Sequence, residues 1–151
     1  MQKRNIFISH YSGDAKVARQ LKTCIGVVFL GQPQIFLSED LQPGANWFSE
    51  IATFLKKKPI TIVIATHESI KRPWVWFEVG ASWNAGGAVI PVCCKGMTLS
   101  KLPDPLGRLT ATNLTQKGIH ILLNAIAKHS GCTLDMSIAT AAIKKTFGSL
   151  P

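Results

Sequence analysis

The sequence is short of acidic residues and of long apolar runs, and each shortage narrows the class of protein. Its 151 residues include 8 Asp and Glu against 17 Lys and Arg, which gives a net charge of +9. No stretch approaches the roughly 20 apolar residues of a membrane-spanning helix or forms a signal-peptide core. Since 46% of the residues are hydrophobic, the chain can bury a core. We expect a folded, cytoplasmic protein that makes no membrane contact.

Paired cysteine motifs are missing as well. The sequence has 4 cysteines and no C-x-x-C spacing, so it indicates neither a zinc ribbon nor a redox pair. Cys93 and Cys94 are neighbours, and on a strand their side chains would point to opposite faces and could not bind one ion together. We expect four reduced, mostly buried thiols and no metal site.

The common nucleotide-binding and hydrolase motifs do not occur. There is no G-x-G-x-x-G after the first strand, no P-loop and no G-x-S-x-G elbow. His67 and Glu68 begin an H-E-x-x-H pattern, but position 71 is a lysine. The basic residues are scattered without interleaved aromatics, which argues against nucleic-acid binding. A positive surface equally favours an anionic small molecule such as a dinucleotide.

Apolar runs and helical periodicities alternate along the chain. Buried strands are expected at residues 5–9, 34–37, 60–65 and 89–93, with a short edge strand at 108–112. Helices are expected from about Asp14, from Trp47 to the lysine run at 56–58, from Trp74 to about Ala85, and from Gly118 to His129. This alternation predicts an α/β fold, a doubly wound parallel sheet with helices on both faces. Ligands bind such sheets outside the carboxyl ends of the strands, here at loops 9–14, 38–46, 66–73 and 94–105.

The segment from Pro73 to Glu78 is the most informative part of the sequence. On a helix, Trp74 and Glu78 are four residues apart and share one face. This helix begins near the carboxyl edge, so an indole and a carboxylate can face the crevice together. The indole suits a flat aromatic group, and the carboxylate suits ribose hydroxyls or an oxocarbenium-like transition state. The alternative is a packed tryptophan and a solvated glutamate.

Other residues have both a functional and an ordinary interpretation. His10 is a candidate general base because its unperturbed pKa lies near neutrality, whereas a solvated or structural loop histidine is the alternative. Asp14 is better interpreted as a helix cap than as a catalyst. Trp76 and Trp83 lie on a different face from Trp74, where we expect core or helix–helix packing, with an assembly surface as the alternative.

Five blocks of sequence occur in the order found in one known family. They are Ile6 to His10 followed by Asp14, Ser38 to Trp47, Arg72 to Ala81 with a W-x-x-x-E pattern, Val89 to Val92, and Leu102 to Leu106. Together they resemble a TIR (Toll/interleukin-1 receptor) domain of the bacterial kind, which implies a flavodoxin-like sheet of about five strands. We expect the TIR domain at residues 1–130 and a tail at 131–151, in which residues 137–146 favour one short helix.

The resemblance implies an activity and a set of site residues. Catalytic members of the family cleave NAD+ at the nicotinamide–ribose bond, and bacterial members commonly act in antiphage defence. Carried over by position, the catalytic residue is Glu78, and the substrate-binding residues are Phe7, Ser9, His10 and Trp74. The loop residues Leu41, Pro43 and Gly44 would gate the site and contact neighbouring TIR domains in an active oligomer or filament. NAD+ would be the substrate, with no cofactor or metal.

The expected function is therefore an NAD+ glycohydrolase or cyclase. A non-catalytic TIR adaptor that pairs with other TIR domains is the main alternative and has the same fold. Nucleoside deoxyribosyl transfer is a third possibility, because enzymes of that class have a similar fold and also use a glutamate. It would turn over nucleosides and leave NAD+ untouched.

Overall fold

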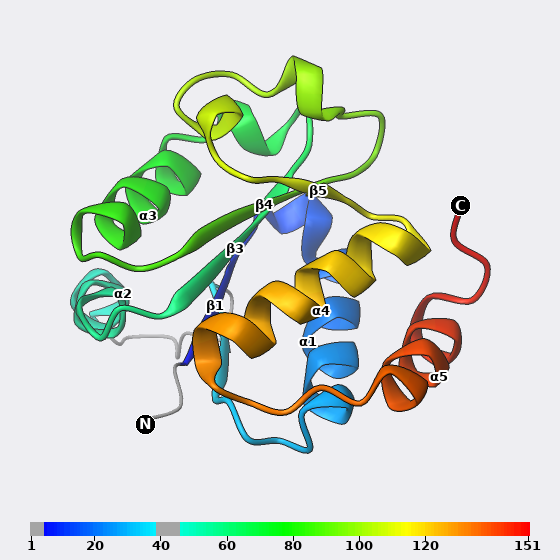
Figure 1. Cartoon of the computed structure of the whole chain (residues 1–151). Coiled ribbons are helices and arrows are strands. Elements are labelled where there is room, and N and C mark those ends of the chain that lie inside the picture. Colours follow the sequence, from blue (N-terminus) through cyan, green and yellow to red (C-terminus); the bar gives the residue numbers. More distant parts are fainter. Residues whose placement is uncertain (1–4, 39–45) are drawn as a thin grey trace.

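The computed structural model describes residues 5–38 and 46–151, shown in Figure 1. Five parallel strands form one sheet in the order β2–β1–β3–β4–β5. The strands are β1 (Ile6–Ser9), β2 (Ile35–Leu37), β3 (Ile60–Ala65), β4 (Val89–Cys93) and β5 (Thr112–Asn113). This strand order is that of the flavodoxin-like fold. The predicted doubly wound α/β architecture is confirmed.

Helices cover both faces of the sheet (Figure 1). One face packs against α1 (Ala15–Val28), α4 (Gln116–Ser130) and α5 (Met136–Phe147). The other face packs against α2 (Trp47–Lys56) and α3 (Pro73–Asn84). Alternate strand residues point to opposite faces, so Ile62 belongs to the first layer and Val63 to the second. β3 is buried at every residue because it has a neighbouring strand on each side and a helical layer on each face.

Pro91 shows how a proline fits inside this sheet. Thr61 N–H donates to the carbonyl of Ala88, and Cys94 N–H donates to the carbonyl of Ala65. Even-numbered backbone groups of β4 therefore face β3, and the odd-numbered Pro91 has its nitrogen on the β5 side. β5 pairs only with Val92 and Cys93. The missing N–H consequently breaks no ladder hydrogen bond.

The expected edge strand at 108–112 is wrong in its position. Leu106–Arg108 form a short 3-10 turn, and the chain reaches the sheet only at Thr112–Asn113. Leu106 is fully buried in the cluster under α3, so this segment packs over the sheet before it can join the edge. Trp83 also departs from its expected core packing, because 62% of its surface is exposed.

The chain after α4 returns to the core. Ala139, Ala142 and Ile143 of α5 are buried in the same cluster as α1 and α4. The division into a domain at 1–130 and a tail at 131–151 remains a prediction. All four cysteines are buried and free, with Cys93 and Cys94 in clusters on opposite faces, as strand geometry requires. In the described part of the chain, every helix is too short or too polar to span a membrane.

Two glycines in helices give opposite predictions for substitution by alanine. A Cβ on Gly118, in the first turn of α4, would collide with the carbonyl oxygen of Asn113. A Cβ on Gly26, inside α1, would have no atom within 4 Å. We expect Gly118→Ala to lower the free energy of unfolding by about 1–3 kcal/mol and Gly26→Ala to raise it by up to about 1 kcal/mol.

Urea unfolding followed by circular dichroism checks this matched pair, because the two variants make the same chemical change in helices of the same layer. A Gly118→Ala midpoint at or above that of the wild type would show that the close approach to Asn113 is not a constraint.

Candidate active site around Glu78

Glu78 belongs to the buried stripe of α3. Pro73 starts this helix at a position where its missing N–H leaves no hydrogen bond unmade. The residues that α3 buries are Val75, Glu78, Val79 and Ser82, a spacing of three and four that faces the sheet. Glu78 therefore occupies a position where a helix normally places an apolar side chain, and none of its surface is exposed.

The Glu78 carboxyl has one partner from the end of β1. Ser9 Oγ donates a hydrogen bond to Glu78 Oε1 at 2.9 Å. The other oxygen, Oε2, is buried and accepts no hydrogen bond from any described residue. Burial raises the pKa of Glu78 to about 8, although the Ser9 hydrogen bond acts in the opposite direction. The carboxyl is thus mainly protonated at neutral pH in this form.

Trp74 lies one turn before Glu78 in an aromatic cluster formed by Trp47, Phe48, Trp74 and Phe77. Its ring stacks on Phe77 at 4.9 Å between centroids and meets the edge of Trp47 at 4.3 Å. Phe48 joins the cluster through Phe77 at 5.2 Å. Trp74 is half-buried, whereas Trp47 and Phe48 are exposed at the start of α2. The cluster joins α2 to α3 beside the site.

Phe7 is fully buried below this cluster. Its ring lies 5.8 Å from that of Phe36 and 6.0 Å from that of Phe54. Phe7 and Ser9 point to the same face of β1, so the strand places an apolar side chain and a hydrogen-bond donor in succession toward α2 and α3. The Phe7 ring thus packs beside β2 and α2, next to the site.

His10 follows Ser9 and is also buried. Its Nδ1 lies 3.1 Å from Ser38 Oγ and 3.4 Å from the carbonyl oxygen of Ile8. His10 thereby connects the ends of β1 and β2 at the carboxyl edge. The predicted gating residues Leu41, Pro43 and Gly44 come directly after this point and lie outside the described residues.

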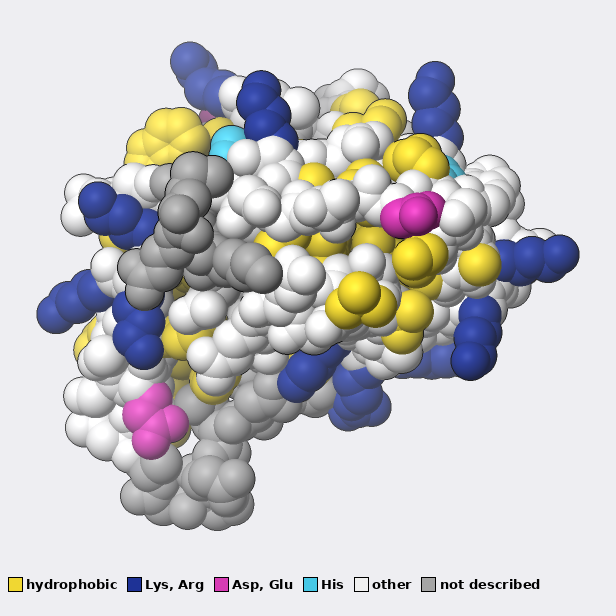
Figure 2. All heavy atoms as spheres, turned by 60° about the horizontal axis from the view of Figure 1, so that its bottom comes forward, with side chains coloured by type: hydrophobic (Ala, Val, Ile, Leu, Met, Phe, Trp, Pro, Cys, Tyr) yellow, Lys and Arg dark blue, Asp and Glu magenta, His cyan; other side chains and the backbone are white. Residues whose placement is uncertain are grey.

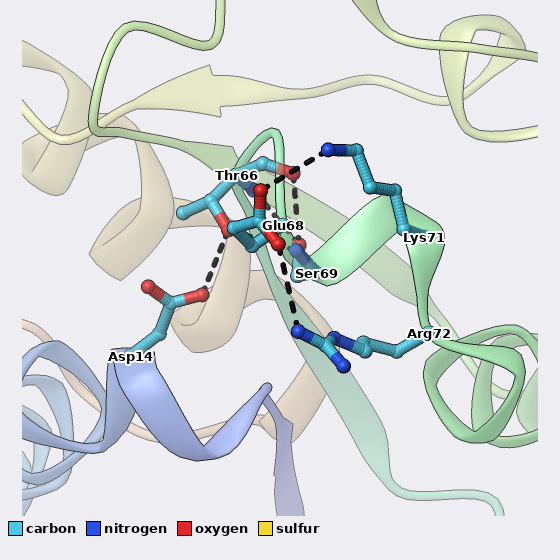
Figure 3. Close-up of polar contacts among 6 residues, drawn as sticks. All are labelled: Asp14, Thr66, Glu68, Ser69, Lys71 and Arg72. Atoms are coloured by element: carbon cyan, nitrogen blue, oxygen red, sulfur yellow. Dashed lines mark hydrogen bonds and ion pairs between the residues drawn. The ribbon is translucent and has the colours of Figure 1, made fainter.

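Asp14 organises the polar carboxyl edge of the sheet (Figure 3). Its side chain is 2% exposed, accepts a hydrogen bond from Thr66 Oγ1 at 2.8 Å and pairs with Lys95 Nζ at 2.7 Å. Asp14 occupies the N-cap position of α1 but makes no side-chain capping bond, so the expected capping role is wrong. Its carboxylate instead joins the loops that follow β1, β3 and β4.

Thr66 and Ser69 tighten the loop after β3 by bonding each other. Thr66 N–H donates to Ser69 Oγ at 2.8 Å, and Ser69 N–H donates to Thr66 Oγ1 at 3.0 Å. Thr66, Ser69 and Lys95 belong to no sequence motif that predicts these contacts. The available signal was their place at the carboxyl ends of β3 and β4, where ligand-binding loops were expected.

Arg72 and Lys71 add positive charge to this edge. The Arg72 guanidinium lies over the Tyr11 ring at 4.4 Å from its centroid, within the range of a cation–π contact. Glu68 pairs with Lys71 at 3.1 Å and with Arg72 at 3.5 Å, and all three side chains are substantially exposed (Figure 3). Such exposed pairs contribute little stability, and they leave one net positive charge beside the site.

Comparison with known proteins decides the family. The model of the TIR domain matches residues 6–124. The chain belongs to the TIR domain family. The match contains the Glu78 helix and every described strand, and it confirms the resemblance seen in the five sequence blocks.

The TIR domain also shares its fold with a solved structure whose sequence is very different. CMP N-glycosidase BcmB from Clostridium botulinum superposes with a TM-score of 0.52 at 9% identity, covering 80% of this chain and 99% of that chain. An identity this low shows a shared fold only. No curated protein matches the chain.

The raised pKa of Glu78 predicts a specific loss of stability with pH. Between about pH 4.5 and 8 the unfolded state is ionised at Glu78 while the folded state keeps its proton. The unfolded state then binds fewer protons, so stability falls as pH rises through this interval by about 1.4 kcal/mol per pH unit and levels off above it. Glu78→Gln, which is uncharged at every pH, should lose this decline.

Urea midpoints of the wild type and Glu78→Gln from pH 5 to 9 measure the difference. Glu50→Gln, which removes an exposed carboxylate from α2, should follow the wild type. Parallel pH curves for the wild type and Glu78→Gln would mean that Glu78 ionises near its ordinary pKa.

Proposed function

We propose that this TIR domain cleaves the nicotinamide–ribose bond of NAD+, as a glycohydrolase or as a cyclase. The observation that carries the proposal is the Glu78 carboxyl. It is completely buried at the carboxyl edge of a parallel sheet, it is bonded through Oε1 to Ser9, and its Oε2 has no described partner. A buried oxygen without a partner is rare in proteins and is well suited to accept a hydrogen bond from a ribose hydroxyl.

The chemistry of NAD+ suits a site with one carboxylate and no strong acid. The nicotinamide ring is already cationic, so the electron pair of the broken C–N bond neutralises its nitrogen and no proton has to be supplied. Positive charge develops on the ribose at the anomeric carbon, and an ionised Glu78 stabilises it electrostatically. Water or the adenine ring then bonds to that carbon and releases a proton, giving ADP-ribose or a cyclic isomer.

Substrate binding would also change the protonation of Glu78. A cationic ring brought close to a buried carboxyl favours its ionised form, which opposes the effect of burial. Arg72, stacked on Tyr11, and Lys95, held by Asp14, provide positive charge for the pyrophosphate at the same edge. In this proposal Trp74 and the neighbouring aromatic cluster bound the site on the side of α2.

The burial of Glu78 makes access a separate requirement. Because none of its surface is exposed, NAD+ can reach it only after neighbouring elements separate. We propose that assembly with other TIR domains produces this opening and that the loop with Leu41, Pro43 and Gly44 takes part in it. The proposed biological role is bacterial antiphage defence, through NAD+ depletion or a cyclic nucleotide signal in the cytoplasm.

Two other functions are favoured by one observation each. The same burial of Glu78 suits a non-catalytic adaptor that works through TIR–TIR contacts alone. The shared fold with CMP N-glycosidase favours cleavage of the N-glycosidic bond of a nucleotide such as CMP. Both bonds join a nitrogen heterocycle to the anomeric carbon of a ribose, so CMP is a direct comparator for NAD+.

The proposal predicts nicotinamide release that depends on Glu78. The purified chain is incubated with NAD+ or CMP, free at high concentration and immobilised on beads to promote assembly, and products are separated by chromatography. We expect turnover of NAD+, with a loss of at least about 100-fold in Glu78→Gln because transition-state charge stabilisation is removed. Glu50→Gln should keep wild-type activity.

Three other outcomes of this experiment would contradict the proposal. Turnover of CMP without NAD+ would replace the substrate, and no turnover by folded protein under any condition would favour the adaptor. Turnover that survives Glu78→Gln would remove Glu78 from the mechanism.

The pH dependence of kcat/KM reports the ionisation of Glu78 in the free enzyme. If the ionised form is active, kcat/KM should rise with pH and level off above about 8, the pKa that burial produces. Ser9→Ala removes the hydrogen bond that lowers this pKa, so its profile should move to higher pH. A Ser9→Ala profile unchanged in midpoint and only reduced in height would contradict this role of Ser9.

A further inference from the structure

A groove of about 430 Å³ lies between α1 and α5, which cover the face of the sheet opposite Glu78. The two helices lie side by side in Figure 1. The described lining residues come from these two helices and are Lys16, Arg19, Gln20, Thr23, Val27, Ala142, Lys145 and Thr146. The family match ends at residue 124, so one wall of this groove lies beyond the matched segment.

The groove is a fixed part of the fold. Ala142 of its floor is buried in the core cluster, with Ile143 beside it. At one end, Gln20 Nε2 donates a hydrogen bond to the backbone carbonyl of Thr146 at 3.3 Å. The packing and this bond together set the separation of the two walls.

The charge of both walls has one sign. The α1 sequence contains Lys16, Arg19 and Lys22, the α5 sequence contains Lys144 and Lys145, and neither helix has an acidic residue. Asp14 is buried and bonded to Thr66 and Lys95, and Asp135 accepts hydrogen bonds at the start of α5. Among the described residues, none of those that line the groove is acidic. Figure 2 shows an excess of basic side chains on the underside of the whole molecule, where Lys and Arg project around its outline and acidic side chains are sparse.

The floor of the groove includes two apolar side chains, Val27 and Ala142, among polar ones. Val27 is 50% exposed, and Ala142 is buried. A ligand that presents carboxylates or phosphates to the basic side chains and apolar groups to Val27 and Ala142 would match this lining. Single-stranded nucleic acid fits poorly, because base stacking uses aromatic side chains and none of the described lining residues is aromatic.

We propose that this groove docks an acidic amphipathic segment of a partner protein. Lys16 and Val27 are eleven residues apart in the chain, which corresponds to a groove of about 16 Å along α1 and to a partner helix of roughly three turns. Its apolar stripe would cover Val27 and Ala142, and its carboxylates would pair with Lys16 and Lys145. This is the helix-in-groove mode of recognition. It does not depend on Glu78, which lies on the other face of the sheet.

The test uses a fluorescein-labelled peptide of about four helical turns, with leucines spaced at three and four residues and glutamates elsewhere. Fluorescence anisotropy measures its binding to the full chain. Three labelled comparators are a scrambled peptide of the same composition, a peptide with lysine in place of glutamate, and a single-stranded oligonucleotide. We expect the acidic amphipathic peptide to bind tightest, with an affinity that falls as salt rises.

Charge reversal locates the site. In Lys16→Glu/Lys145→Glu we expect the affinity for the acidic peptide to fall about tenfold or more and the lysine peptide to bind instead. Binding of the lysine peptide also shows that the altered groove is folded. Lys57→Glu/Lys101→Glu makes the same change in net charge at exposed positions outside the groove and should bind like the wild type.

Three results would overturn the proposal. Equal losses in the two double variants would mean that only net charge matters. Equal binding of the scrambled peptide would remove the apolar floor from recognition. Tighter binding of the oligonucleotide, lost in the groove variant, would assign the groove to nucleic acid.

Discussion

The hydrogen bond between Ser9 and the buried Glu78 carboxyl is the contact on which the site depends. It joins the end of β1 to the middle of α3, and it holds an ionisable group where the helix would otherwise bury an apolar one. Removing a carboxylate from water is costly unless it becomes neutral or gains partners, so this form keeps the proton. The proposed reaction needs the ionised form. Packing and chemistry therefore favour opposite protonation states of one residue.

The topology explains why this residue lies at an edge rich in polar side chains. In a parallel sheet all carboxyl ends meet on one side, and the loops after β1, β3 and β4 are brought together there. Asp14 ties these loops through Thr66 and Lys95. That half of the edge is braced by buried hydrogen bonds. The half beside α2 is bounded by Trp47 and Phe48, which are partly exposed.

The two faces of the sheet have different surroundings in this TIR domain. The face under α2 and α3 contains Glu78 and the aromatic cluster. The face under α1, α4 and α5 contains the larger core cluster and, at its surface, the basic groove. A partner bound in that groove would leave α2 and α3 free for other contacts. Recruitment and catalysis, as proposed, are thus separated by the thickness of the sheet.

Local patterns predicted most of the elements because their causes are local. The β-branched run of β3, Pro73 at the first position of α3 and the helical spacing of α4 each place an element within a residue or two. The edge strand was misplaced because Leu106 is held by a distant cluster under α3 and not by its neighbours in sequence. Trp83 was misjudged for a related reason, since tertiary packing decides which helix face meets solvent.

Sequence patterns alone were enough to predict the α/β alternation, to indicate the family through the W-x-x-x-E helix and its neighbouring blocks, and to select Glu78 as the candidate catalyst. Contacts between distant residues bury Glu78 completely and raise its pKa, bond Asp14 to Thr66 and Lys95 instead of leaving it to cap α1, and bring α5 against α1 to form a groove. The physical reason is that a side chain's solvation, partners and pKa depend on residues far away in the chain. A linear pattern specifies which elements form, and their packing sets the environment of each side chain.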